Sequence, residues 1–118
     1  MRKKAWKIFS EYIRRRDGGF CFTCGKYNGW QETEAGHFIH KDCLDFNEIN
    51  IHAQCSRCNR WLHGNSGEYA IRLIKMYGIK AVDNLKREGN RVRKFNMGEL
   101  EEIIAKYKSK IENLTNNY

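Results

Sequence analysis

The sequence predicts an α+β protein in which two short strands and a metal-binding loop lie between an N-terminal helix and a helical C-terminal half. Two observations carry this prediction. Two Cys-x-x-Cys pairs, Cys21/Cys24 and Cys55/Cys58, stand thirty residues apart, a spacing at which four thiolates bind one tetrahedral zinc ion. Outside that loop, apolar residues recur at the three- and four-residue spacing of amphipathic helices. Because thirty residues are too few for a second core, we expect the zinc to anchor the loop at its base.

The length of 118 residues suits one domain, which we divide into a zinc-bound core at 20–65 and a helical appendage at 66–118. No run approaches the ~20 apolar residues that a membrane span requires, and the charged, amphipathic stretch after Met1 is unlike a signal peptide. The expected compartment is therefore the cytoplasm, and we expect no membrane partner. In a reducing compartment, paired cysteines bind metal more often than they form disulfides. The fifth cysteine, Cys43, is assigned no role.

The chain is basic, with 22 lysines and arginines against 14 acidic residues and a formal net charge of +8. A small basic domain attracts polyanions, of which nucleic acid is the commonest in a cytoplasm. The cations gather at 14–16, beside the second cysteine pair at Arg57 and Arg60, and at 86–94. A merely solvated surface is the alternative interpretation, and the clustering favours DNA.

The N-terminal half predicts one helix and two strands. An apolar stripe from Trp6 to Ile13 predicts a helix over 3–16, which Asp17-Gly18-Gly19 ends. The first cysteine pair then has the pattern of a zinc knuckle, whose tight turn Gly25 permits. Residues 34–39 and 46–52 predict two paired strands, and a helix from Gln54 to about residue 63 would carry the second cysteine pair.

The C-terminal half predicts three helices. The first begins near Ser66 and ends at Gly78, a short one follows over 79–85, and residues 90–95 form a basic extended arm. Asn96 caps the last helix, which bears an apolar stripe from Leu100 to Leu114. We interpret this stripe as packing surface, used either in the core or as the seam of a dimer.

Three polar positions accompany the cysteines. Gly36-His37 falls on the predicted first strand, Asn50 on the second, and Asn59 directly after Cys58. This layout resembles the HNH, or ββα-metal, nuclease motif, in which a strand histidine, a second-strand asparagine and a helical metal ligand meet. The resemblance implies that His37 is the general base, that Asn50 pins the hairpin and orients the base, and that Asn59 binds a catalytic Mg²⁺ or Mn²⁺.

One departure from the motif concerns the carboxylate. HNH nucleases usually carry a metal-binding aspartate before the first histidine, where this chain has Gly36. Strand alternation places Glu34 on the same face, so Glu34 is a candidate ligand, with a solvent-facing residue as the alternative. His63, four residues after Asn59 on the predicted helix, is an added candidate ligand. His37 has a structural histidine as its alternative, and His40 and His52 are expected to be structural or phosphate-facing.

A longer resemblance rests on the runs E-A-G-H-F and F-N-E-I-N-I-H-A-Q-C-S-R-C-N-R-W-L-H-G-N. From Cys21 to Phe95 the chain resembles the phage NinG/Rap family of recombination endonucleases. The cysteine spacing is also similar to that of the dimeric phage endonuclease VII resolvases. These resemblances imply structure-selective cutting of branched DNA, such as Holliday junctions and D-loops, by a homodimer in a phage-infected bacterium. Arg57 and Arg60 would hold flanking phosphates.

Two other classes of protein fit the same cysteines and charge. One is a zinc-stabilised DNA-binding module without catalysis, and the other is a protein-interaction domain like a zinc ribbon. Neither explains why His37, Asn50 and Asn59 all fall on motif positions.

Overall fold

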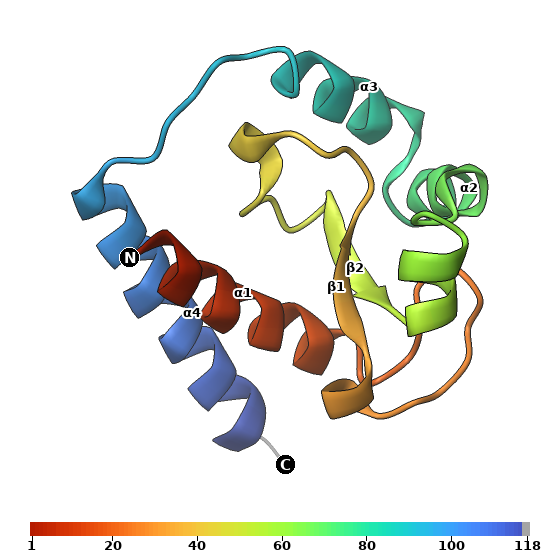
Figure 1. Ribbon diagram of the computed structural model, residues 1–118, viewed down its shortest axis with the longest axis horizontal. Coiled ribbons are helices and arrows are strands. Elements are labelled where there is room, and N and C mark those ends of the chain that lie inside the picture. The colour runs from red at the N-terminus through yellow and green to blue at the C-terminus, as the bar shows by residue number, and fades with distance from the viewer. Residues whose placement is uncertain (117–118) are drawn as a thin grey trace.

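Two short antiparallel strands lie at the centre of the molecule, with helices on both sides (Figure 1). In this computed structural model, which describes residues 1–116, β1 (Glu34–His37) pairs with β2 (Ile51–Gln54). Positions 117 and 118 of the predicted 1–118 domain lie outside the described residues. The register sets Glu34 opposite Gln54 and Gly36 opposite His52, so these four residues share one face of the sheet. The mixed helical and two-stranded architecture confirms the predicted α+β class.

The N-terminal helix α1 (Arg2–Arg16) covers the other face of the sheet. Its residues Phe9 and Ile13 are buried in one cluster with Ile51 of β2, because apolar positions recur every three or four residues. The helix therefore begins and ends close to its predicted bounds of 3 and 16.

The last helix, α4 (Met97–Asn116), crosses α1 (Figure 1). Asn96 and Glu99 cap it reciprocally, the Glu99 N–H donating to Asn96 Oδ1 at 2.8 Å and the Asn96 N–H donating to Glu99 Oε1 at 3.2 Å. Tyr107 packs edge-on against Phe9 with ring centroids 4.7 Å apart. Leu100, Ile104 and Tyr107 of the stripe are thus buried within the chain, where they pack with residues of α1. Ile103, Ile111 and Leu114 are partly buried beside them.

Two helices close the opposite side of the sheet, α2 (Ser66–Tyr77) and α3 (Ile79–Glu88). Tyr69 is wholly buried and its hydroxyl donates to the carbonyl of Gly36 at 2.8 Å, which ties α2 to β1. Gly78 joins the two helices at φ +90°, a conformation that glycine adopts without strain. Among the helices within residues 1–116, none is long and apolar enough to cross a membrane.

The strands are shorter than predicted, and the second one is shifted. β1 ends at His37 rather than 39, and β2 spans 51–54 rather than 46–52. The connection is folded by side chains: Asn47 Oδ1 accepts from the N–H groups of Ile49 and Asn50 at 2.9 and 3.0 Å. These bonds form a turn where the sequence predicted a strand.

His52 is a buried titratable group on β2. Its Nε2 lies 3.0 Å from the Tyr77 hydroxyl, whereas Nδ1 is buried without a hydrogen-bond partner among the described residues. Burial, followed by the charge of Arg16, lowers the pKa of His52 from 6.5 to about 3. The folded chain therefore holds a neutral imidazole at neutral pH.

We expect His52 to lower the free energy of unfolding as the pH falls. The unfolded chain takes up a proton below about pH 6.5 that the folded chain refuses, so stability present above that pH is lost as the pH falls toward 3. Chemical denaturation at pH 7 and pH 5 should show that wild type loses about 2 kcal/mol more than His52→Gln. Equal losses in the two proteins would contradict this assignment, and loss of metal at low pH affects both alike.

Candidate functional site

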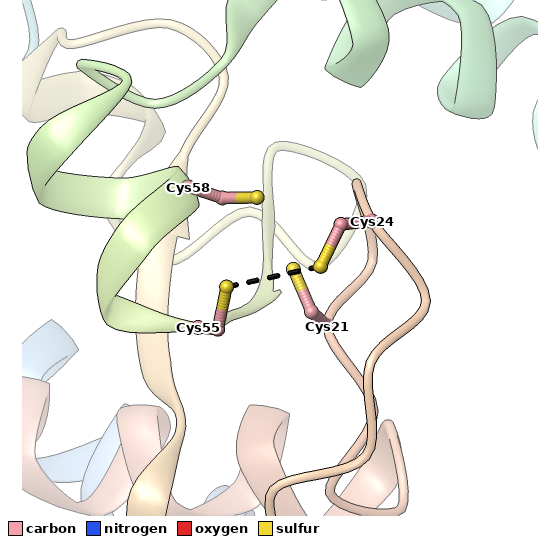
Figure 2. Close-up of side chains that lie close together, drawn as sticks. All are labelled: Cys21, Cys24, Cys55 and Cys58. Atoms are coloured by element: carbon pink, nitrogen blue, oxygen red, sulfur yellow. Dashed lines mark hydrogen bonds between the residues drawn. The ribbon is translucent and has the colours of Figure 1, made fainter.

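Four cysteine sulfurs converge beside the sheet (Figure 2). Cys21 and Cys24 come from the loop after α1, and Cys55 and Cys58 come from the turn after β2. The four sulfur atoms all lie within 4.8 Å of one another, and Cys24 Sγ is 3.8 Å from Cys55 Sγ. A tetrahedron with Zn–S bonds of about 2.3 Å has sulfurs about 3.8 Å apart. The cluster therefore has the size that one zinc ion needs.

The surroundings of the sulfurs favour the thiolate at Cys21 and oppose it at Cys24 and Cys58. Burial opposes ionisation of Cys21, but hydrogen bonds from Thr23 and from the backbone N–H groups of Cys55 and Cys24 lower its pKa. Burial and the neighbouring thiols raise the pKa of Cys24 and of Cys58. Four thiols this close cannot all ionise without a cation between them, and a bound dication removes that repulsion.

Cys58 lies on a π-helical turn, Arg57–Trp61, and Cys55 stands between β2 and this turn, so the predicted α-helix does not form there. The Leu62 N–H donates to the carbonyl of Arg57 at 2.8 Å, a wide i to i+5 bond. His63 follows this turn, is exposed, and has φ +51°. The prediction that Asn59 and His63 share a helical face is wrong because the chain has left the helix before His63.

Glu34 and Asn59 meet at the edge of the cysteine cluster. Asn59 Nδ2 donates to Glu34 Oε1 at 2.9 Å, and Arg60 makes a 2.6 Å ion pair with Glu34 Oε2. Burial alone would raise the pKa of the Glu34 carboxyl, but the hydrogen bonds from Asn59 and Arg60 outweigh it and lower the pKa. Glu34 is therefore ionised at neutral pH, and the structure brings together the two residues that the sequence singled out as oxygen ligands.

His37 projects from the opposite face of β1. Its Nε2 lies 3.0 Å from Asp45 Oδ1, and its ring stacks on Trp6 with centroids 5.0 Å apart. Arg2 also donates to Asp45, at 2.6 Å. Burial alone would raise the pKa of the Asp45 carboxyl, but the hydrogen bonds from His37 and Arg2 outweigh it and lower the pKa. The imidazole is thus held by a carboxylate that sequence reasoning missed, since no local pattern links residue 45 to residue 37.

The two groups flank the free edge of β1. A shallow hollow lined by Arg2, Trp6 and Asp45 contains His37, and a second hollow contains Glu34, Asn59 and Arg60. Trp6 lines both hollows. His37 is 21% exposed, so its ring is not turned into the interior.

Asn50 is wholly buried and has a structural position. Its Oδ1 accepts from the Ile39 N–H at 2.9 Å, and its Nδ2 donates to the carbonyls of Ile39 and Leu44 at 3.0 and 3.4 Å. These bonds hold the connection between the strands. Within residues 1–116 the group that hydrogen-bonds the His37 ring is Asp45, so the expectation that Asn50 itself orients the base is corrected.

The predicted DNA-binding cations divide into two groups. Arg14 and Arg15 lie over the Trp30 ring, 5.3 and 4.0 Å from its centroid, and Arg16 donates to two backbone carbonyls at 2.8 and 3.0 Å. These three arginines stabilise the fold. Arg57 is exposed beside the cysteine cluster, whereas Arg60 reaches back to Glu34.

His40 and His52 are not part of either hollow that holds the candidate groups. The His40 ring is exposed and stacks on the His37 ring, with centroids 5.3 Å apart. His52 is buried in the core. Cys43 lies outside the cysteine cluster, and its thiol donates to the carbonyl of Glu88 at 3.3 Å.

The fold and the cluster define a class of small α+β protein in which a two-stranded sheet lies beside four cysteines that could hold one metal ion. A sequence model described as "Bacteriophage Lambda NinG protein" matches residues 1–117, so the chain belongs to that family. It is 36% identical over 119 residues to "Protein ninG" of Escherichia phage lambda and to that of Escherichia phage 933W. It is 35% identical over 116 residues to "Protein ninG" of Salmonella phage P22.

These alignments cover 95 to 98% of this chain but 56 to 58% of the relatives, so the chain spans little more than half of their length. No solved structure matches the chain.

We expect purified protein to carry about one zinc ion per chain, and Cys58→Ser to lose the zinc together with the fold. A structural zinc site contributes about 10–16 kcal/mol in peptides, against a domain stability of about 5–15 kcal/mol. Cys43→Ser is the matched control, because its sulfur lies outside the cluster. Metal analysis and circular dichroism measure both effects, and a folded, zinc-free Cys58→Ser protein would contradict the assignment.

Proposed function

We propose that this chain is the catalytic part of a metal-dependent, structure-selective DNA endonuclease that cuts branched recombination intermediates such as Holliday junctions and D-loops. The observation that carries the proposal is the meeting of Glu34 and Asn59 at 2.9 Å on one face of β1, with the His37–Asp45 pair on the other. Both groups stand on an edge strand. A phosphodiester lying along that edge would contact both.

Glu34 and Asn59 suit a hard divalent cation. A carboxylate and an amide oxygen are the ligand types that Mg²⁺ and Mn²⁺ prefer. When bound, such a cation supplies neutralising charge at the scissile phosphate and the leaving 3′ oxygen. Arg60 forms an ion pair with this carboxylate, and its side chain is 73% exposed, so it can turn outward to a phosphate.

His37 would take the proton of the attacking water. Asp45 accepts from Nε2–H, which leaves Nδ1 as the basic nitrogen and fixes the tautomer. Trp6 holds the ring by stacking at an interplanar angle of 17°. The base is therefore oriented from two sides before substrate arrives.

Branched DNA offers unstacked bases and closely spaced phosphates. Trp61, 80% exposed on the same turn as Cys58, presents a stacking surface beside Arg57. Arg91 and Lys94 lie in the basic arm that lines a third hollow with His40. Selectivity by shape and phosphate spacing fits this surface, because exposed cations and an exposed aromatic ring contact backbone and unstacked bases without regard to sequence.

A DNA-binding module without catalysis is the second candidate, and one observation favours it. His37 and Glu34, which holds Asn59, extend from opposite faces of β1, so a single phosphate must reach both groups across the strand edge. A gel assay for Mg²⁺-dependent nicking of a four-way junction separates the two candidates, because the module binds the junction and never cuts it.

We expect His37→Ala to reduce the nicking rate about 10²–10⁴-fold, the usual contribution of a general base. Zinc content and junction affinity should stay near wild type, since His37 lies on the face of β1 away from the cysteines. His63→Ala is the control and should nick normally, because that ring lies beyond the π-helical turn. Wild-type nicking by His37→Ala would remove His37 as the base.

Two opposed strands of a junction require two copies of the site, so we propose a homodimer. The stripe of α4 is occupied by α1, whereas Ile71, Met76 and Ile79 are exposed on α2 and α3. Sedimentation at micromolar concentration should show twice the chain mass of 14.0 kDa. A monomer with full nicking activity would exclude the dimer.

A further inference from the structure

Gln54 occupies the space where a side chain at position 36 would stand. Gln54 is the last residue of β2, lies opposite Glu34, and is wholly buried. A Cβ built on Gly36 would lie 1.8 Å from Gln54 Oε1, so a side chain at position 36 and the amide in this place exclude each other. Glycine at position 36 therefore lets the amide cross the strand.

The orientation of the Gln54 amide is fixed by its own donors. Nε2 donates to the carbonyl of Gly64 at 2.8 Å and to Thr23 Oγ1 at 3.2 Å. Because a carbonyl only accepts, the nitrogen must face Gly64 and the oxygen must face Gly36. Oε1 is buried and has no hydrogen-bond partner among the described residues. A buried acceptor without a hydrogen-bond partner costs folding free energy, so such an atom in a native protein usually has a function or binds an ion or water.

A second amide oxygen points to the same place. Asn59 Oδ1 lies 3.1 Å from the point where the Gly36 Cβ would stand. Its amide nitrogen donates to Glu34 Oε1 at 2.9 Å, so Oδ1, the acceptor of this amide, is the atom that faces Gly36. The amide oxygens of Asn59 and Gln54 thus gather over Gly36, and the Glu34 carboxylate joins them through its bond with the Asn59 amide.

We propose that Gln54 Oε1 is a ligand of the divalent cation held by Glu34 and Asn59. It takes the place of the carboxylate that HNH nucleases usually carry at the position of Gly36. One carboxylate and two neutral amide oxygens form a hard, oxygen-only donor set that suits Mg²⁺ or Mn²⁺. This inference rests on the proposed metal site and adds a ligand that the motif does not predict.

Mn²⁺ binding to the zinc-loaded protein tests the ligand without reference to cutting. In wild type, Mn²⁺ should broaden the side-chain amide signals of Gln54 and Asn59 in the NMR spectrum, since the ion lies beside both. Electron paramagnetic resonance of free Mn²⁺ gives the affinity. Gln54→Met, of similar volume but without the amide oxygen, should weaken binding about tenfold or more.

Two further variants test the assignment. Cys43→Ser is the control and should bind Mn²⁺ like wild type, because its thiol bonds to the carbonyl of Glu88 rather than to any of the proposed ligands. Gly36→Asp combined with Gln54→Ala places a carboxylate in the vacated space and should recover binding lost in Gln54→Ala. Zinc content is measured throughout to show that each variant is folded.

The proposal is overturned if Gln54→Met binds Mn²⁺ with wild-type affinity. It is also overturned if Mn²⁺ leaves the Gln54 signals of wild type unbroadened.

The Mn²⁺ experiment and the nuclease assay can fail independently. A protein that binds Mn²⁺ through Gln54 but never nicks a junction keeps the ligand and loses the enzyme. A protein that nicks, with Gln54→Met binding Mn²⁺ normally, keeps the enzyme and loses the ligand.

Discussion

The convergence of four sulfur atoms is the constraint on which the rest of the structure depends. Cys21 and Cys24 fix the loop after α1, and Cys55 and Cys58 fix the turn after β2. A sheet of two four-residue strands is too small to stabilise itself. With a metal ion bound, the four cysteines would do what a larger core does elsewhere, and they would set the position of Asn59 by holding its neighbour Cys58.

Much of the fold follows from local pattern. The helices α1, α2, α3 and α4 were all predicted, because their apolar positions repeat at helical spacing and glycine or a capping asparagine marks their ends. The cysteine cluster was predicted because ligand spacing is itself a sequence property. Strand alternation predicted the face of β1 on which Glu34 lies, and this is the face that Asn59 contacts.

The parts that were wrong depend on distant contacts. β2 is buried along its whole length, so it shows no alternation that would mark its bounds. The connection from 42 to 50 is folded by the side chains of Asn47 and Asn50, which bond to backbone rather than continue a strand. The pairing of His37 with Asp45, and the crossing of Gln54 over Gly36, depend on a register that no single segment encodes.

The π-helical turn at 57–61 has a consequence for how this protein can vary. Such a turn is an α-helical turn with one residue more, and in an α-helix each residue rotates the next by about 100°. Cys58 and Asn59 are adjacent, yet one faces the sulfur cluster and the other faces Glu34. A one-residue deletion here would tighten the turn and rotate one of the two away from its partner. Insertions and deletions should therefore be tolerated in the arm at 90–95, whereas at positions 57–61 they would separate Cys58 or Asn59 from its partner.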